Sequence, residues 1–202
     1  MKDKTSYTLD YYNQQAEEFV NSTVDVDFSN IQNQFIKMLP KRSTILDLGC
    51  GSGRDSKAFK NAGYKVIAVD GSEELCKIAS KHIGQEVICS TFQDLELSEE
   101  IDGIWACASL LHLEKEEIIY TINKLSKNLK PGGILYASFK YGNFTGERNG
   151  RFFTDMTEES FSIMMNDIKD LKVIKQMTSD DVREDKTIKW LNVFLKKEIV
   201  LL

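Results

Sequence analysis

The stretch Ile45-Leu46-Asp47-Leu48-Gly49-Cys50-Gly51-Ser52-Gly53 decides the fold of this chain. An apolar run passes directly into glycines at alternate positions, and a helix-forming segment follows from Arg54. This pattern predicts a buried strand, a tight loop and the start of a helix. Glycine suits such a loop because it lets the backbone approach a ligand and adopt positive φ. The helix N-terminus beyond it offers N–H groups to a carboxylate or phosphate.

Outward from this segment, short apolar runs alternate with amphipathic stretches. We expect strands over 44–48, 65–69, 86–89, 101–107 and 134–139, helices over 54–62, 72–81, 115–129 and 157–165, and closing strands over 171–178 and 190–196. Strands that are apolar on both faces predict a largely parallel sheet covered by helices on two sides. The short polar connection over 179–186 suits an antiparallel hairpin. The expected fold is a Rossmann-like α/β sheet of seven strands, mostly parallel, with an antiparallel last pair.

Two further regions complete the expected organisation. Residues 1–40 contain apolar residues at helical spacing and end at Pro40, which predicts an N-terminal cap of two helices. Residues 41–202 then form the core. The connection after the fifth strand, up to Phe153, is long, polar and basic, and we expect it to be a loop over the substrate side.

Composition narrows the classes of protein that this chain can represent. It has 202 residues, 42% of them hydrophobic, and a formal net charge of −5. These values are typical of a globular domain and argue against a surface that binds nucleic acid as a whole. The four cysteines form no CxxC pair, so we expect neither a metal site nor a disulfide framework. The chain shows neither a secretory signal nor an apolar run that could span a membrane, and a cytoplasmic location is expected.

A second chemical signal stands at the end of the next expected strand. Asp70 closes the run Val66-Ile67-Ala68-Val69-Asp70, and a carboxylate there can accept hydrogen bonds from both hydroxyls of a ribose. A dinucleotide site would require the spacing Gly-x-Gly-x-x-Gly, but Arg54 stands at the position of the third glycine. The two signals together favour a single nucleoside over a dinucleotide.

The spacing of Gly49, Gly51 and Gly53 resembles motif I of the class I S-adenosylmethionine-dependent methyltransferases. Further matches follow in the same order, at Asp70, Gln93-Asp94-Leu95, Ala106-Cys107-Ala108 and the turn Leu129-Lys130-Pro131-Gly132-Gly133. More narrowly, Gly51-Ser52-Gly53-Arg54-Asp55 is similar to the small tellurite-resistance-type methyltransferases. The resemblance implies S-adenosyl-L-methionine as cofactor and S-adenosyl-L-homocysteine as product. It does not carry tellurite over as the substrate.

The resemblance also implies a set of cofactor-binding residues. These are Tyr12, Asp47, Gly49, Gly51, Gly53, Asp70, Gly71, Ser72, Asp94, Leu95 and Cys107. Asp47 would accept N–H groups of the loop, or act there as a purely structural acceptor. Asp94 would meet the adenine amino group, or serve only as a turn residue. Tyr12 would fold over the cofactor from the N-terminal helix, or belong to the core.

Candidate residues for the acceptor side follow the fourth and fifth strands. His112 is the candidate general base, although a histidine there can equally be a structural hydrogen-bonding residue. The basic connection supplies candidate substrate contacts at Lys140, Tyr141, Arg148, Arg151 and Phe152, unless its charges are simply hydrated.

These residues predict an enzyme that moves a methyl group to a small, anionic or planar acceptor by in-line displacement. One alternative is an RNA or nucleotide methyltransferase, which the acidic net charge disfavours. Another is a non-catalytic module that binds the cofactor. An arsenic methyltransferase is less attractive, because that chemistry depends on several converging thiols. The expected partner is a small molecule, no membrane partner is expected, and the expected protein is a monomer or homodimer.

Overall fold

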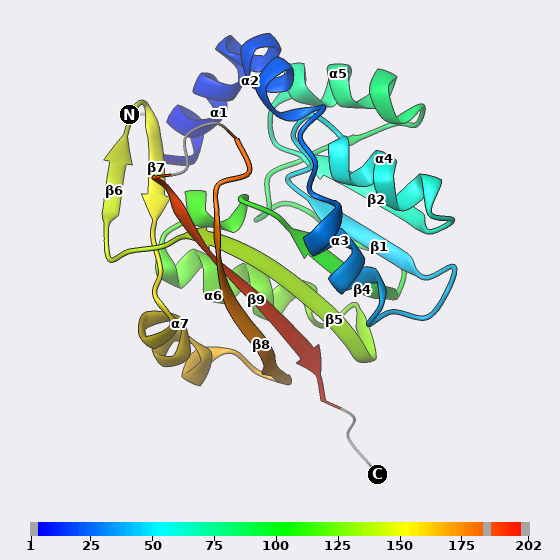
Figure 1. Ribbon diagram of the computed structural model, residues 1–202, viewed down its shortest axis with the longest axis vertical. Coiled ribbons are helices and arrows are strands. Elements are labelled where there is room, and N and C mark those ends of the chain that lie inside the picture. Colours follow the sequence, from blue (N-terminus) through cyan, green and yellow to red (C-terminus); the bar gives the residue numbers. More distant parts are fainter. Residues whose placement is uncertain (1–3, 184–186, 199–202) are drawn as a thin grey trace.

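The strand that precedes the glycine-rich loop lies inside a seven-stranded sheet. The computed structural model describes residues 4–183 and 187–198, so residues 184–186 of the expected connection lie outside the described part. The sheet has the order β3-β2-β1-β4-β5-β9-β8 (Figure 1). Its strands are β1 (Thr44–Leu48), β2 (Lys65–Asp70), β3 (Ile88–Cys89), β4 (Ile101–Ala106), β5 (Leu129–Lys140), β8 (Leu171–Asp180) and β9 (Lys189–Lys197).

The pairing within the sheet confirms the predicted fold class. β1 pairs in parallel with β2 and β4, and the pairs β2–β3 and β4–β5 are also parallel. Within this sheet, β9 is the one strand that runs in the opposite direction, so it pairs antiparallel with both β5 and β8. Strand order therefore reverses between β1 and β4. In open α/β sheets, ligands bind outside the carboxyl ends of the strands at such a point.

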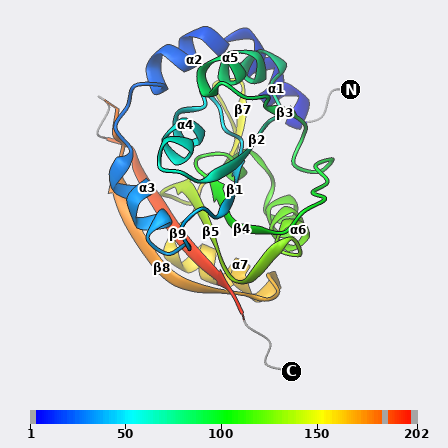
Figure 2. The same ribbon diagram turned by 90° about the vertical axis from the view of Figure 1, so that its right-hand side faces the viewer.

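Helices cover both faces of the sheet, as Figure 2 shows. On one face, α3 (Ser29–Ile36), α4 (Arg54–Asn61) and α5 (Glu73–Ile83) bury Phe35, Phe59 and Ile83 against the strands. On the other face, α6 (Lys115–Leu125) and α7 (Glu158–Met164) bury Ile122 and Phe161. Local signals mark both ends of α5, because Ser72 caps its N-terminus and Gly84, in the left-handed conformation, ends it.

The N-terminal region contains three helices where the sequence predicts two. α1 (Lys4–Gln14) and α2 (Ala16–Thr23) are separated by Gln15 alone, whose φ of −110° and ψ of 18° are not helical. A break of one residue preserves the apolar spacing across it, so the periodicity does not reveal it. α1 and α2 lie together at the end of the molecule that also carries β7 (Figure 1). α3 instead packs on the sheet.

The basic connection after β5 is not an unstructured loop, as the sequence led us to expect. It forms a hairpin of β6 (Thr145–Arg148) and β7 (Arg151–Thr154). The turn residues Asn149 and Gly150 have φ of 52° and 73°, as a two-residue hairpin turn with positive φ at both positions requires. The hairpin gives the basic side chains fixed positions.

A second difference concerns the turn expected before the fifth strand. α6 ends at Leu125, four residues earlier than predicted, because tighter turns follow it: the N–H of Asn128 bonds the carbonyl of Leu125 at 3.1 Å. β5 then begins at Leu129 and includes Pro131 to Gly133, with an irregular register against β4.

Candidate active site

A cavity of about 940 Å³ opens at the carboxyl ends of the central strands. Gly49 follows β1, Asp70 ends β2, Cys107 follows β4 and Lys140 ends β5, and all four line the cavity. Residues of α1, α2 and β7 line it as well. Of the seventeen residues predicted for the site, the cavity gathers Tyr12, Gly49, Gly51, Asp70, Gly71, Cys107, His112, Lys140 and Arg151.

The glycines at the strand ends are packed so closely by their neighbours that a side chain would not fit. Gly49 and Gly51 have φ of +78° and +54°. A Cβ on Gly49 would lie 2.5 Å from the Cβ of Ser109, and one on Gly51 would lie 3.0 Å from the ring of Phe19. Gly71 is also close-packed, because its Cβ would lie 2.7 Å from a methyl group of Leu9. These positions leave bare backbone facing the cavity, which fits a nucleoside-containing cofactor.

Asp70 places a buried carboxylate beside that backbone. One carboxylate oxygen accepts the N–H of Gly51 and the other accepts the N–H of Ser72, both at 2.9 Å. Burial raises the pKa of Asp70, and the backbone hydrogen bonds from Ser72, Gly51 and Gly71 oppose that rise. A carboxylate has further lone pairs and can accept additional hydroxyl donors.

Three predicted cofactor residues support the loop from behind instead of lining the cavity. Asp47 is buried and accepts the hydroxyl of Ser56 at 2.6 Å. Burial, followed by repulsion from Asp55, raises the pKa of Asp47 to about 8. Gly53 allows α4 to meet α5, since its Cβ would lie 2.8 Å from Ile83. Ser72 caps α5 and also donates its hydroxyl to Asn13 of α1 at 2.7 Å.

The segment after β3 differs from the expectation more clearly. Asp94 is exposed, does not line the cavity, and accepts the hydroxyl of Thr91 at 2.7 Å within a turn. Leu95 is buried in the core on the α6 side of the sheet. The cavity is lined here by Thr91, Phe92 and Gln93 instead. The structure therefore gives Asp94 the turn position that the sequence had left as the alternative.

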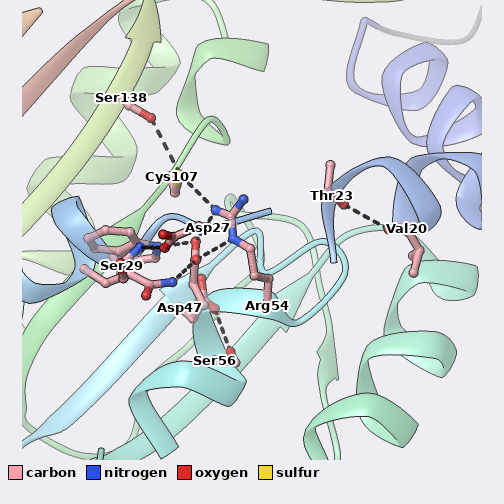
Figure 3. Close-up of polar contacts among 12 residues, drawn as sticks. Val20, Thr23, Asp27, Ser29, Asp47, Arg54, Ser56, Cys107 and Ser138 are labelled. Atoms are coloured by element: carbon pink, nitrogen blue, oxygen red, sulfur yellow. Dashed lines mark hydrogen bonds and ion pairs between the residues drawn. The ribbon is translucent and has the colours of Figure 1, made fainter. Parts of the chain in front are cut away.

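A buried ion pair forms another wall of the cavity (Figure 3). Arg54 bonds both carboxylate oxygens of Asp55, at 2.8 Å and 3.0 Å, and its guanidinium lies 4.6 Å from the centre of the Phe28 ring. Asp55 also accepts the indole N–H of Trp105 at 2.8 Å. The Cys107 thiol lies 3.9 Å from Arg54, but burial raises its pKa to about 12. Cys107 is therefore a neutral thiol at ordinary pH.

His112 ends a short 3-10 helix (Leu110–His112), lines the cavity and contacts the N-terminal helix α1 directly. Its Nε2 lies 2.9 Å from the Tyr12 hydroxyl, and its Nδ1 lies 2.7 Å from the backbone carbonyl of Phe152. Burial, together with the charges of Arg151 and Lys140, lowers its pKa to about 4. With this pKa, His112 is a neutral imidazole at pH 7.

The hairpin divides the predicted substrate residues. Lys140 and Arg151 line the cavity, whereas Arg148 pairs with Asp155 at 2.6 Å and stays outside it. Tyr141 points away and donates its hydroxyl to Glu158 at 2.8 Å. Phe152 is buried, and its backbone carbonyl, not its ring, meets His112.

Sequence reasoning missed several residues of the cavity wall. Ser109 is buried, and its hydroxyl finds no partner in the part of the chain that the structure describes. Asp181 accepts hydrogen bonds from Arg183 at 2.7 Å and from the Trp190 indole at 3.1 Å, and all three line the cavity. Asp181 and Arg183 belong to the β8–β9 connection and Trp190 to the start of β9, and this segment carries no motif. Only the topology brings this connection to the carboxyl ends of the parallel strands.

The described ranges, 4–183 and 187–198, contain neither a candidate membrane span nor a candidate metal site. No helix there is long and apolar enough to cross a membrane. No group of three or more His, Cys, Asp or Glu side chains there is placed to hold a metal ion.

Comparison with known proteins gives matches over the same region. Residues 45–133 match the model of a family described as methyltransferase domain. The cypemycin N-terminal methyltransferase of a Streptomyces species is 35% identical over 98 residues, which cover 46% of this chain and 40% of that protein. The chain thus spans less than half the length of the first curated relatives that it matches.

Solved structures match nearly the whole chain. The 1,6-didemethyltoxoflavin-N1-methyltransferase of Burkholderia thailandensis, solved with 1,6-didemethyltoxoflavin and S-adenosylhomocysteine, superposes with a TM-score of 0.80 at 16% identity, over 98% of this chain and 92% of that one. The [4+2]-cyclase SpnF superposes with a TM-score of 0.72 at 13% identity, over 94% of both chains. Residues 45–133 thus match a methyltransferase domain family, and the described chain shares the fold of these solved structures, one of which is a methyltransferase solved with S-adenosylhomocysteine.

Proposed function

We propose that this chain is an S-adenosylmethionine-dependent methyltransferase acting on a small molecule. The observation that carries the proposal is the meeting of a bare glycine backbone and a buried acid at one cavity. Gly49 and Gly51 have no room for a side chain and present bare backbone at the cavity, and Asp70 stands beside them. The cavity of about 940 Å³ lies within the usual range for small-molecule sites, and it continues past this corner to Lys140 and Asn192.

The residues present fit the cofactor. When bound, it supplies a methyl group already activated on a sulfonium. Gly49 and Gly51 would let its amino-acid part approach the loop, and Asp70 would accept the ribose hydroxyls. Tyr12 and Phe19 would cover it from α1 and α2, because both line the cavity. An aromatic face beside the sulfonium gains cation–π attraction.

Alignment and exclusion of water are the main tasks left to the protein. We propose that α1 and α2 act as the lid, as part of the predicted cap over residues 1–40. Leu9 of α1 and Phe19 of α2 support this role, since both line the cavity and lie close to Gly71 and Gly51 at the strand ends. The proposed setting remains the cytoplasm, and the proposed assembly a monomer or homodimer.

The acceptor side supports a small anionic or planar acceptor. Lys140 and Arg151 supply positive charge there, and Tyr12 and Phe153 supply aromatic faces. His112 lines the cavity, and its role as general base stays a prediction. Its Nε2 is occupied by the Tyr12 hydroxyl, which would have to move before His112 could take a proton.

A second candidate function is cofactor binding without methyl transfer. The likeness to SpnF favours it, because the same fold there belongs to a protein named as a [4+2]-cyclase and not as a methyltransferase. The predicted RNA or nucleotide methyltransferase has weaker support, since the chain carries a formal net charge of −5.

Calorimetry with S-adenosylhomocysteine, followed by transfer of a labelled methyl group, tests the proposal. The acceptor panel contains carboxylic acids, phenols, amines, thiols and an oligoribonucleotide. We expect cofactor binding and label on a small molecule. Lack of cofactor binding at millimolar concentration would overturn the proposal. Cofactor binding with no label on any acceptor would favour cofactor binding without methyl transfer. Label on the oligoribonucleotide alone would favour an RNA or nucleotide methyltransferase.

A further inference from the structure

The positive charges of the cavity wall are not all neutralised by the protein. Arg54 pairs with Asp55 at 2.8 Å, and Arg183 pairs with Asp181 at 2.7 Å. Lys140 lines the same cavity without any ion pair in the described ranges, and the same holds for the nearby Arg151. Two cations therefore face the cavity with no carboxylate of their own.

These two cations gather around a single ring. The Nζ of Lys140 lies 4.5 Å from the centre of the Phe153 ring, and the guanidinium carbon of Arg151 lies 5.3 Å from it. Arg148, which is paired with Asp155, also lies 4.8 Å from the same centre. The imidazole of His112 packs against the same ring at 4.9 Å. The guanidinium of Arg151 also lies 4.3 Å from the Tyr11 ring, which holds it in place. We call Lys140 and Arg151 the cationic pair.

The cationic pair is costly unless an anion joins it. The Nε of Arg151 is buried, and no described residue offers it a hydrogen-bond partner. Lys140 is half-buried, and burial together with repulsion from Arg148 and Arg151 lowers its pKa, although the carboxylate of Asp155 partly opposes that change. Removing charges from water without a partner is unfavourable, so this arrangement suits a ligand that brings negative charge. The planar fork of an arginine matches an oxyanion in particular.

We propose that the methyl acceptor is an oxyanion, held in its ionised form by Lys140 and Arg151, and that no protein base removes its proton. This inference rests on the proposed methyltransferase function and names the substrate class of that site. The cationic pair favours the ionised acceptor over its neutral acid, because opposite charges within about 4–6 Å stabilise a charged form.

The surroundings of His112 support an acceptor that needs no base. Tyr12 from α1 hydrogen-bonds its Nε2, and the Phe152 carbonyl from β7 accepts from its Nδ1. Lys140 from β5 and Arg151 from β7 both disfavour a second positive charge on the ring. An imidazole in this position holds Tyr12 and the hairpin in place, but its lowered pKa makes it a weak base.

The transfer step balances without a proton. A lone pair of the acceptor oxygen forms the new bond to the methyl carbon. The methyl–sulfur bond breaks, and its electron pair remains on sulfur, so the negative charge of the acceptor and the positive charge of the sulfonium disappear together. The methylated product no longer carries the anion that paired with Lys140 and Arg151, which favours its release.

The probe for this inference is 4-nitrophenol, whose phenolate absorbs visible light and whose neutral form does not. It is titrated by absorbance in the presence of the S-adenosylhomocysteine-loaded protein. We expect the bound probe to ionise about one pH unit or more below the free probe. Lys140→Met and Arg151→Met should each reduce this difference. The matched control is Lys41→Met, because Lys41 is an exposed cation before the amino end of β1, whereas the cavity opens at the carboxyl ends of the strands.

Two results would overturn the inference while leaving the proposed function standing. One is a loaded protein on which the probe ionises at the same pH as in buffer. The other is a loaded protein that does not bind the probe saturably. A protein that fails to bind S-adenosylhomocysteine, measured first by calorimetry, would instead overturn the proposed function. Each variant must keep the wild-type affinity for S-adenosylhomocysteine, which separates loss of the cationic pair from misfolding.

Discussion

The Tyr12 hydroxyl lies 2.9 Å from Nε2 of His112, and this contact joins α1 to the segment after β4. The opposite ring nitrogen, Nδ1, lies 2.7 Å from the carbonyl oxygen of Phe152. A carbonyl can only accept, so Nδ1 carries the proton and Nε2 accepts the hydroxyl of Tyr12. One histidine therefore connects three elements of the cavity wall: the N-terminal helix, the strand end and the β6–β7 hairpin.

Removing the Tyr12 hydroxyl should loosen this connection. Tyr12→Phe leaves the buried Nε2 without a donor, which should lower the free energy of unfolding by about 1–3 kcal/mol. Urea denaturation measures the loss. Tyr7→Phe is the matched control on the same helix, because 52% of the Tyr7 side chain is exposed. Equal stability of the two variants would show that the hydrogen bond contributes nothing.

The lowered pKa of His112 predicts how the stability changes with pH. It is about 4 in the folded chain, below the ordinary value of 6.5. Between these values the unfolded chain binds a proton here that the folded chain does not, so stability rises with pH. The contribution of neutral His112 to the free energy of unfolding is present in full above about pH 6.5. It decreases by about 3 kcal/mol as the pH falls through 4.

Denaturation at a series of pH values tests this dependence. Other groups titrate in the same range, so the useful quantity is the difference between wild type and His112→Gln. That difference should shrink as the pH falls from 7 to 4. His82→Gln is the control, because His82 lies near the end of α5 and does not line the cavity. A difference that stays constant over this range would contradict the lowered pKa.

The sheet could be predicted from the sequence because its signals are local. The glycines after β1, the acid that ends β2 and the cap at Ser72 each act within a few residues, so spacing alone revealed them. The β6–β7 hairpin also had a local signal in Asn149-Gly150, which the surrounding charges obscured. Residue types that are polar and basic suggested a loop, although the turn residues favoured paired strands.

The pairings that shape the site could not be predicted in this way. Tyr12 meets His112 across 100 residues of sequence, and Trp105 meets Asp55 across 50. Such contacts depend on how the helices settle on the strand ends, which no short motif encodes. For Asp94 the sequence left the two roles open, because a turn residue and a ligand-binding acid look alike there.

Asp70 should matter far more for cofactor affinity than Asp94. Asp70→Asn replaces a buried charged acceptor at the cavity, and we expect a loss of about 1.5–3 kcal/mol in S-adenosylhomocysteine binding, the usual effect for a hydrogen bond to a charged group. Asp94→Asn should bind as the wild type does, because Asp94 is exposed and outside the cavity. Calorimetry on both variants decides the matter. Weakened binding by the Asp94 variant would restore the role that the sequence suggested.

Gly49 should tolerate no side chain, and Gly63 provides the matched comparison. Both have a positive φ, +78° and +87°, so alanine at either position carries the same backbone strain of about 1–2 kcal/mol. A Cβ at Gly63 meets nothing within 4 Å, whereas one at Gly49 would lie 2.5 Å from the Cβ of Ser109. Gly49→Ala should therefore lose about 1–3 kcal/mol more stability than Gly63→Ala, from overpacking alone. It should also abolish S-adenosylhomocysteine binding, which Gly63→Ala should keep. If both variants unfold at the same urea concentration and bind alike, the loop does not approach Ser109 as closely as described, and the cradle proposed for the cofactor is wrong.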